Sequence, residues 1–165
     1  MDGLDENDGD DSTDVSTMRG RDYPAIRQFS IFQPNKVGQL LRLMRVVETA
    51  RLRVCAISIQ DSAECSIIRL VVTQPERARE LFEQKGYKFC ETDLLAVELP
   101  NRDQPILSIC QNLLRAEVNI HYSFPLMSLP EERPAMAFHV DDIEMASGVL
   151  SREGFTLITE NDLEF

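Results

Sequence analysis

Residues 34–58 read PNKVGQLLRLMRVVETARLRVCAIS, and this stretch decides the fold because it passes from a turn to a helix and then to a strand. Pro34-Asn35 is a turn-forming pair. Apolar residues then recur with the spacing of one helix face: Val37, Leu40, Leu41, Met44 and Val47. The run from Leu52 to Gln60 is rich in apolar and β-branched residues, which predicts a strand.

The sequence on either side of this stretch completes a six-element unit. A short apolar run precedes the turn. After the first helix come a hairpin, a second helix and a last strand, and the second helix has Pro75 in its first turn and Gly86 at its end. The expected strands are Gln28–Phe32, Leu52–Gln60, Cys65–Val72 and Lys88–Thr92. The order is strand, helix, strand, strand, helix, strand.

The same order occurs a second time. Pro100-Asn101 repeats the turn Pro34-Asn35. The segment Ala116–Ile120 lies as far beyond the second turn as Ala50–Val54 lies beyond the first. Gly154, the counterpart of Gly86, comes slightly later than this spacing requires, which predicts a short insertion in the second hairpin. A shared order of turn, helix and stop indicates a tandem repeat of about 70 residues.

The predicted fold class is α+β, with two ferredoxin-like βαββαβ repeats over residues 26–93 and 94–165. The repeats should pack side by side into an extended antiparallel sheet with the helices on one face. The strand Leu52–Gln60 is apolar on both faces, so its open face should be covered as well. We expect another subunit to cover it, in a homodimer.

Composition and charge exclude several classes of function. The 17 basic and 28 acidic residues give a net charge of −11, which argues against binding to nucleic acid phosphates. Acidic residues are concentrated near the start of the chain, so residues 1–25 should form a disordered acidic tail, either solvating or for docking a partner. No apolar run is long enough for a membrane span, and no secretory signal or cysteine pairing pattern occurs. We expect a cytoplasmic protein with reduced thiols.

No residue pattern points to catalysis, a cofactor or a metal. The two histidines, His121 and His139, fall in predicted strands, where packing is a commoner role than metal binding. No cysteine has an evident partner base, and the motifs of phosphate, dinucleotide and hydrolase sites do not occur. The sequence predicts a protein that is not an enzyme.

The turn before the first helix is the strongest candidate for a ligand site. Asn35 is a good N-cap, and Gly38 would then lie inside the first helical turn, where glycine costs about 0.5–1 kcal/mol relative to alanine. Two interpretations of Gly38 are open. The glycine allows close packing against a neighbouring strand, or it lets a ligand reach backbone N–H groups at the helix start.

The turn, the helix and the strand after it resemble the ACT domain, an amino-acid-binding regulatory family. The family's turn has Asn or Asp, any residue, Pro or a small residue, Gly, any residue and Leu, and Asn119-Ile120 resembles the start of the family's second strand. The resemblance covers the whole chain after the acidic tail, as two ACT repeats. It implies paired units in an eight-stranded sheet, with an amino acid bound at the interface between units.

The resemblance also implies which residues bind the ligand. The α-carboxylate and α-ammonium groups would contact the turn, formed by Asn35, Lys36, Val37, Gly38, Gln39 and Leu40. The facing wall would be Cys55, Ala56, Ile57 and Ser58, or the repeat counterparts His121, Tyr122, Ser123 and Phe124. Gln104 stands where Gly38 stands in the first repeat, so we expect the second repeat to have lost its ligand turn.

The expected function is a non-catalytic regulatory or sensor protein that binds an amino acid between ACT-like repeats and responds allosterically. The alternative is a ligand-free interaction module, or a regulatory subunit of an amino-acid metabolic enzyme such as acetolactate synthase. A third hypothesis, acylphosphatase-like chemistry, requires an anion loop backed by an arginine, and no such loop stands out.

Overall fold

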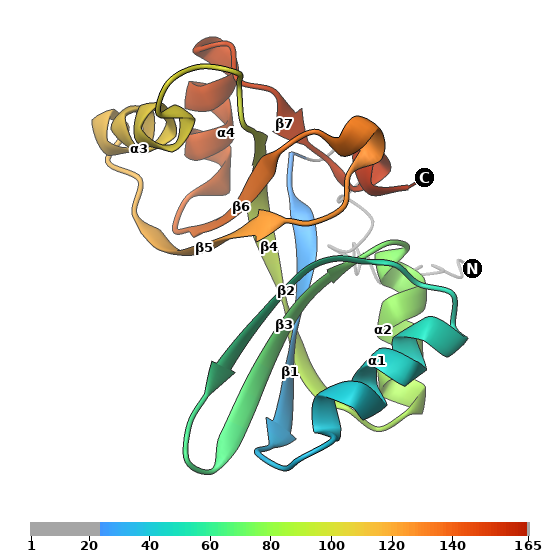
Figure 1. Ribbon diagram of the computed structural model, residues 1–165. Helices are drawn as coiled ribbons and strands as arrows, with labels where there is room; N and C mark the ends of the chain where they lie inside the picture. The colour runs from blue at the N-terminus through green and yellow to red at the C-terminus, as the bar shows by residue number, and fades with distance from the viewer. Residues whose placement is uncertain (1–23, 165) are drawn as a thin grey trace, which may run out of the picture.

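The computed structural model describes residues 24–164, and these form two consecutive α+β units (Figure 1). The helices are α1 (Gln39–Thr49), α2 (Pro75–Gln84), α3 (Pro105–Arg115) and α4 (Ile143–Arg152), with short 3₁₀ helices η2 (Pro130–Glu132) and η3 (Glu160–Leu163). The strands are β1 (Ile26–Pro34), β2 (Val54–Asp61), β3 (Cys65–Val72), β4 (Lys88–Glu98), β5 (Ile120–Leu126), β6 (Ala135–Val140) and β7 (Leu157–Ile158). The expected acidic tail, residues 1–25, falls almost wholly outside the described residues. Within them, Ala25 is buried.

The strands form one antiparallel sheet in the order β2-β3-β1-β4-β6-β5, with β7 beside β4. Strand β4 extends beyond the predicted end at Thr92 and belongs to both units. Its residues 88–94 pair with β1, and its residues 95–98 pair with β6. In Figure 1, β4 runs from the half that carries α1 and α2 to the half that carries α3 and α4.

All four helices lie on one face of this sheet. Phe89 of β4 packs into the core beneath α1 and α2, and Leu95 and Val97 pack into the core beneath α3 and α4. Side chains two residues apart in a strand share a face, so both helix pairs cover the same face of β4. The predicted fold class, two βαββαβ repeats with helices on one face, is confirmed.

The helix-free faces of the two repeats pack against each other. Cys55, Ala56 and Val71 from the first repeat share a buried cluster with Phe124 and Leu126 from the second. A β-bulge between Val54 and Ala56 shifts the register of β2. At Cys55 and Ala56 the chain's own second repeat covers this face, so their burial does not require the second subunit that the sequence led us to expect.

The first helix begins later than the sequence predicts. Gly38 is its N-cap, in a left-handed conformation with φ 86°, and Asn35 instead donates from Nδ2 to Asp61 Oδ2 at 2.9 Å. Asn35 is therefore not the N-cap, because its amide ties the turn to the β2–β3 hairpin. The predicted apolar stripe is correct at Leu40, Met44 and Val47, and wrong at Val37 and Leu41, which are exposed.

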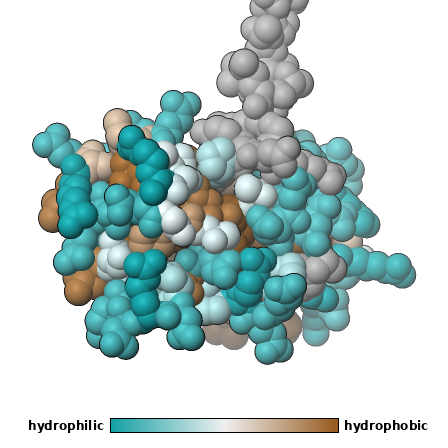
Figure 2. Space-filling model, turned by 90° about the horizontal axis from the view of Figure 1, so that it is seen from above, coloured by the Kyte–Doolittle hydropathy of each residue, from teal (hydrophilic) through white to brown (hydrophobic). Residues whose placement is uncertain are grey.

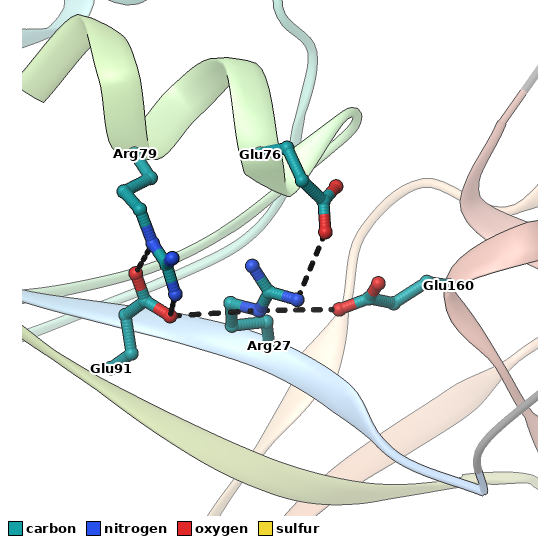
Figure 3. A network of polar contacts seen from close by, with 5 residues as sticks. All are labelled: Arg27, Glu76, Arg79, Glu91 and Glu160. Atoms are coloured by element: carbon teal, nitrogen blue, oxygen red, sulfur yellow. Dashed lines mark hydrogen bonds and ion pairs between the residues drawn. The ribbon is translucent and has the colours of Figure 1, made fainter. Parts of the chain in front are cut away.

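A buried arginine joins the two repeats on the helix side of the sheet (Figure 3). Arg27 of β1 is 7% exposed, and its guanidinium lies 3.1 Å from Glu76 of α2, 3.7 Å from Glu91 of β4 and 3.6 Å from Glu160 of η3. Arg79 forms a bidentate pair with Glu91. Burial raises the pKa of Glu160 above its ordinary value, and Arg27 opposes that shift.

Replacing Arg27 with methionine should destabilise the fold by about 3 kcal/mol at neutral pH, because the Glu160 carboxylate stays buried without its cation. The loss should shrink as the pH falls, since burial raises the Glu160 pKa and protonation removes the unpaired charge. Urea unfolding of both proteins across the pH range measures this. Arg77→Met on the exposed face of α2 is the control and should change stability by less than about 0.5 kcal/mol. Equal losses in the two variants would contradict a role for the ion-pair network.

Candidate functional site

The predicted ligand turn lies at the end of β1 that is remote from the second repeat. Asn35 contacts the β2–β3 hairpin, and Lys36 N donates to the Pro34 carbonyl at 2.9 Å. Lys36 and Val37 are exposed, while Gln39 and Leu40 are half-buried in the first turn of α1. The turn therefore forms an exposed corner of the first repeat.

The structure brings the two predicted wall segments together. Cys55–Ser58 lie on β2 and His121–Phe124 lie on β5, and Ala56 and Phe124 belong to the same buried cluster. The backbone N–H of Met127 donates to the Cys55 carbonyl at 2.7 Å, which joins β2 directly to the end of β5. The two alternatives are thus one surface between the repeats. Two of these residues depart from the prediction. Ile57 packs into the helix-side core, and Ser123 pairs with Phe138 of the second repeat's helix-side core and so faces that side as well.

The turn and the wall of one chain are not brought together. Asn35 binds Asp61 at the hairpin end of β2, whereas Ala56 lies near the other end of that strand. The stretch of strand between Ala56 and Asp61 spans roughly 16 Å. A ligand of amino-acid size that contacts Ala56 therefore does not reach Asn35 in the same chain.

Beside the wall lies a polar cluster that the sequence did not predict. Gln28 is fully buried, and its Nε2 donates to the Tyr122 hydroxyl at 2.8 Å and to Ser30 Oγ at 3.1 Å. The guanidinium of Arg69 lies 4.5 Å from the centre of the Tyr122 ring. Gln28 Oε1 is buried and accepts no hydrogen bond within the described part of the chain.

Two histidines close one side of this cluster. The His139 ring lies 4.8 Å from Tyr122 and 5.0 Å from His121, centre to centre. Burial, and then the nearby charges of His121 and Arg69, lower the pKa of His139. His139 is therefore neutral at physiological pH and adds no charge beside Arg69.

Within residues 24–164, the cluster combines one cation with one unpaired acceptor. Arg69 offers a cation for a carboxylate, and Gln28 Oε1 offers an acceptor for an ammonium group. Phe124 stacks on Tyr122, and the buried apolar cluster that contains Phe124 and Ala56 packs against that tyrosine. Burial raises the pKa of the Cys55 thiol, also in the wall, to about 11, so it is protonated and a poor nucleophile.

A signal for this cluster was present in the sequence. Gln28 and Ser30 alternate with Phe29 and Ile31 along the first strand, which places two polar side chains on the face opposite the helices. Arg69 interrupts an otherwise apolar strand on the same face. The pattern could not show that these side chains meet Tyr122, because that contact requires the sheet to curl.

Two further properties concern the described residues. No helix in residues 24–164 is both long and apolar enough to cross a membrane. In the same residues, no three His, Cys, Asp or Glu side chains are grouped so that they could hold a metal ion.

A family model described as an ACT domain pair matches residues 24–165. Since this match spans most of the chain, the protein belongs to the family of paired ACT domains, as the turn and the repeat indicated. A comparison with curated proteins gives no match.

Solved structures share the fold across both repeats. Protein BT0572 from Bacteroides thetaiotaomicron is similar with a TM-score of 0.77 and 22% identity, over 84% of this chain and 95% of that one. The regulatory subunit of aspartate kinase from Thermus thermophilus is similar with a TM-score of 0.54 and 14% identity, over 82% and 96%. The aspartokinase alpha and beta subunits are similar with a TM-score of 0.50 and 17% identity, over 78% of this chain and 91% of that one. At these identities the likeness concerns the fold.

The structure also explains Gly38 by its backbone conformation. A Cβ atom on Gly38 would meet nothing within 4 Å, so the interpretation that glycine permits close packing is wrong. Its φ of 86° is a conformation that glycine adopts at little cost. At the equivalent N-cap of α3, Gln104 has a φ of 52°, within the left-handed region.

Replacing Gly38 with alanine should therefore cost about 1 kcal/mol of folding stability, through backbone strain alone. The matched variant Gln104→Gly should change stability by less than about 0.5 kcal/mol, because relief of strain is offset by the entropy of glycine. Urea unfolding of the three proteins compares them. A loss in Gln104→Gly as large as that in Gly38→Ala would contradict this account.

Proposed function

We propose that this protein is a non-catalytic regulator that binds a small zwitterion, an amino acid, between its two repeats. The unpartnered oxygen of Gln28 beside Arg69 carries the proposal. Leaving a buried acceptor unsatisfied costs about 1–3 kcal/mol, and a ligand ammonium group recovers that cost. Membership of the ACT family and the regulatory kinase subunits that share the fold support a regulatory role.

Ligand binding would act on the contact between the repeats. Tyr122 belongs to the second repeat and receives its hydrogen bond from Gln28 of the first, with Arg69 of the first repeat over its ring. A ligand that bridges Arg69 and Gln28 would favour the arrangement in which both face Tyr122. The signal to a partner would be this shift in population, with a magnitude set by the difference in affinity for the two arrangements.

The predicted turn, Asn35 to Leu40, would contribute to a ligand site only if a second chain brought it to the wall. We propose that such a site would need a cytoplasmic homodimer, because Asn35 and Ala56 are too far apart in one chain. Light scattering tests the subunit number, and a monomer at all accessible concentrations would remove the turn from the ligand site. The site around Gln28 does not depend on that result.

A second candidate function is that of an interaction module, such as the regulatory subunit of a metabolic enzyme. The observation in its favour is an apolar surface on α3, where Ile106, Leu107 and Leu114 are 43%, 53% and 76% exposed. Figure 2 shows apolar side chains gathered on the side of the molecule where α3 lies. This function needs no amino acid. Leu114→Glu should abolish binding to an enzyme partner while leaving ligand affinity unchanged.

Isothermal titration with the twenty amino acids tests the main proposal. At least one amino acid should bind saturably. Arg69→Met should weaken its affinity at least about tenfold, because the variant lacks the guanidinium that pairs with the ligand's carboxylate. Gln28→Leu should also abolish binding, because it removes the Oε1 acceptor for the ligand's ammonium group. Arg51→Met, at an exposed position after α1, is the control. If the folded protein binds no amino acid at millimolar concentration, the proposal is wrong.

A further inference from the structure

A groove runs along the outer side of the first repeat, between α1 and α2. It consists of two cavities of about 670 and 420 Å³ that share Arg42, Val46 and Lys85. One end lies at Thr49 in the last turn of α1, and the other lies at Gln33 near the end of β1. We call this the α1–α2 groove. It lies on the helix side of the sheet, on the opposite face from the cluster around Gln28.

The groove is basic in an acidic protein. Arg42, Arg45, Lys85 and Lys88 line it, and no lining residue is acidic. None of the four is among the ion pairs found in residues 24–164. Cations gathered in a concave site without counter-charges focus a positive potential there. The net charge of −11 makes this concentration of unpaired cations unusual for the chain.

The floor of the groove is apolar. Leu41, Val46, Ala50 and Leu81 line the larger cavity, and Leu41 is 56% exposed there. The exposed apolar surface can accept the hydrocarbon part of a ligand. The groove therefore offers both cationic groups and apolar contact.

The inner end of the groove contains an unsatisfied amide. Gln33 is 5% exposed, lines the smaller cavity with Gln39 and Arg42, and has neither its Oε1 nor its Nε2 in a hydrogen bond with the described residues. The adjacent start of α1 has no side-chain cap and no acidic residue in its first turn. A bound oxyanion would accept from Gln33 Nε2 and interact favourably with the positive end of this helix.

We propose that the α1–α2 groove binds a small organic carboxylate. Arg42, Lys85 and the Gln33 amide bind its carboxylate group, and Leu41, Val46 and Leu81 contact its hydrocarbon body. The four basic residues and the lack of an acidic residue in the lining favour an anionic ligand over a cationic one. The site is separate from the zwitterion site between the repeats.

Isothermal titration of the full chain at low ionic strength tests the proposal with four probes: hexanoate, acetate, hexanol and inorganic phosphate. Hexanoate should bind saturably, and acetate and hexanol should bind at least about tenfold more weakly because each lacks one of the two contacts. Added salt should weaken hexanoate binding. Phosphate binding as tight as hexanoate binding would overturn the assignment to an organic carboxylate.

Variants locate the bound probe. Arg42→Glu should weaken hexanoate binding at least about tenfold, and the matched control Arg77→Glu on α2 should leave it unchanged. Gln33→Leu should weaken binding and raise the melting temperature by a few degrees, since it removes the buried unsatisfied amide. Arg69→Met should change only the amino-acid affinity. No saturable hexanoate binding at millimolar concentration, or equal affinity in Arg42→Glu and the wild type, would overturn the site.

Discussion

The structure depends on one constraint, which is that a single strand serves both repeats. Strand β4 pairs with β1 over its first part and with β6 and β7 over its last part. A strand twists along its length, so the two halves of the sheet are rotated relative to each other about β4. The helix-free faces then curl toward one another and bury Cys55 and Ala56 against Phe124. The repeats complete each other's core within one chain.

The same constraint places the polar groups that concern function. Gln28 and Gln33 both lie on β1, an odd number of residues apart, so they face opposite sides of the sheet. Gln28 meets Tyr122 at the contact between the repeats, and Gln33 lies at the base of the α1–α2 groove. Both retain a buried polar atom without a partner among the described residues. Buried polar groups are usually satisfied, so the two glutamines mark where a ligand would gain the most.

Sequence reasoning succeeded where the chain interacts with itself locally and failed where distant segments compete. Helical and strand periodicity predicted the element order and the repeat, because each element buries one face with a regular spacing. The start of α1 was misplaced because Asn35, a good cap by local chemistry, hydrogen-bonds to Asp61 on the neighbouring hairpin instead. The buried Arg27 went unnoticed since its three carboxylate partners come from α2, β4 and η3.

Local patterns in the sequence were enough to predict the two βαββαβ units, the family and a special role for the glycine near the first helix start, because these depend on periodicity and backbone conformation. It also showed that β2 is apolar on both faces, without showing what covers the second one. The folded chain shows that the second repeat covers Cys55 and Ala56, and that Asn35 lies at the opposite end of β2 from Ala56. Those outcomes follow from the twist of β4 and the curl of the sheet, which no local pattern of residues encodes.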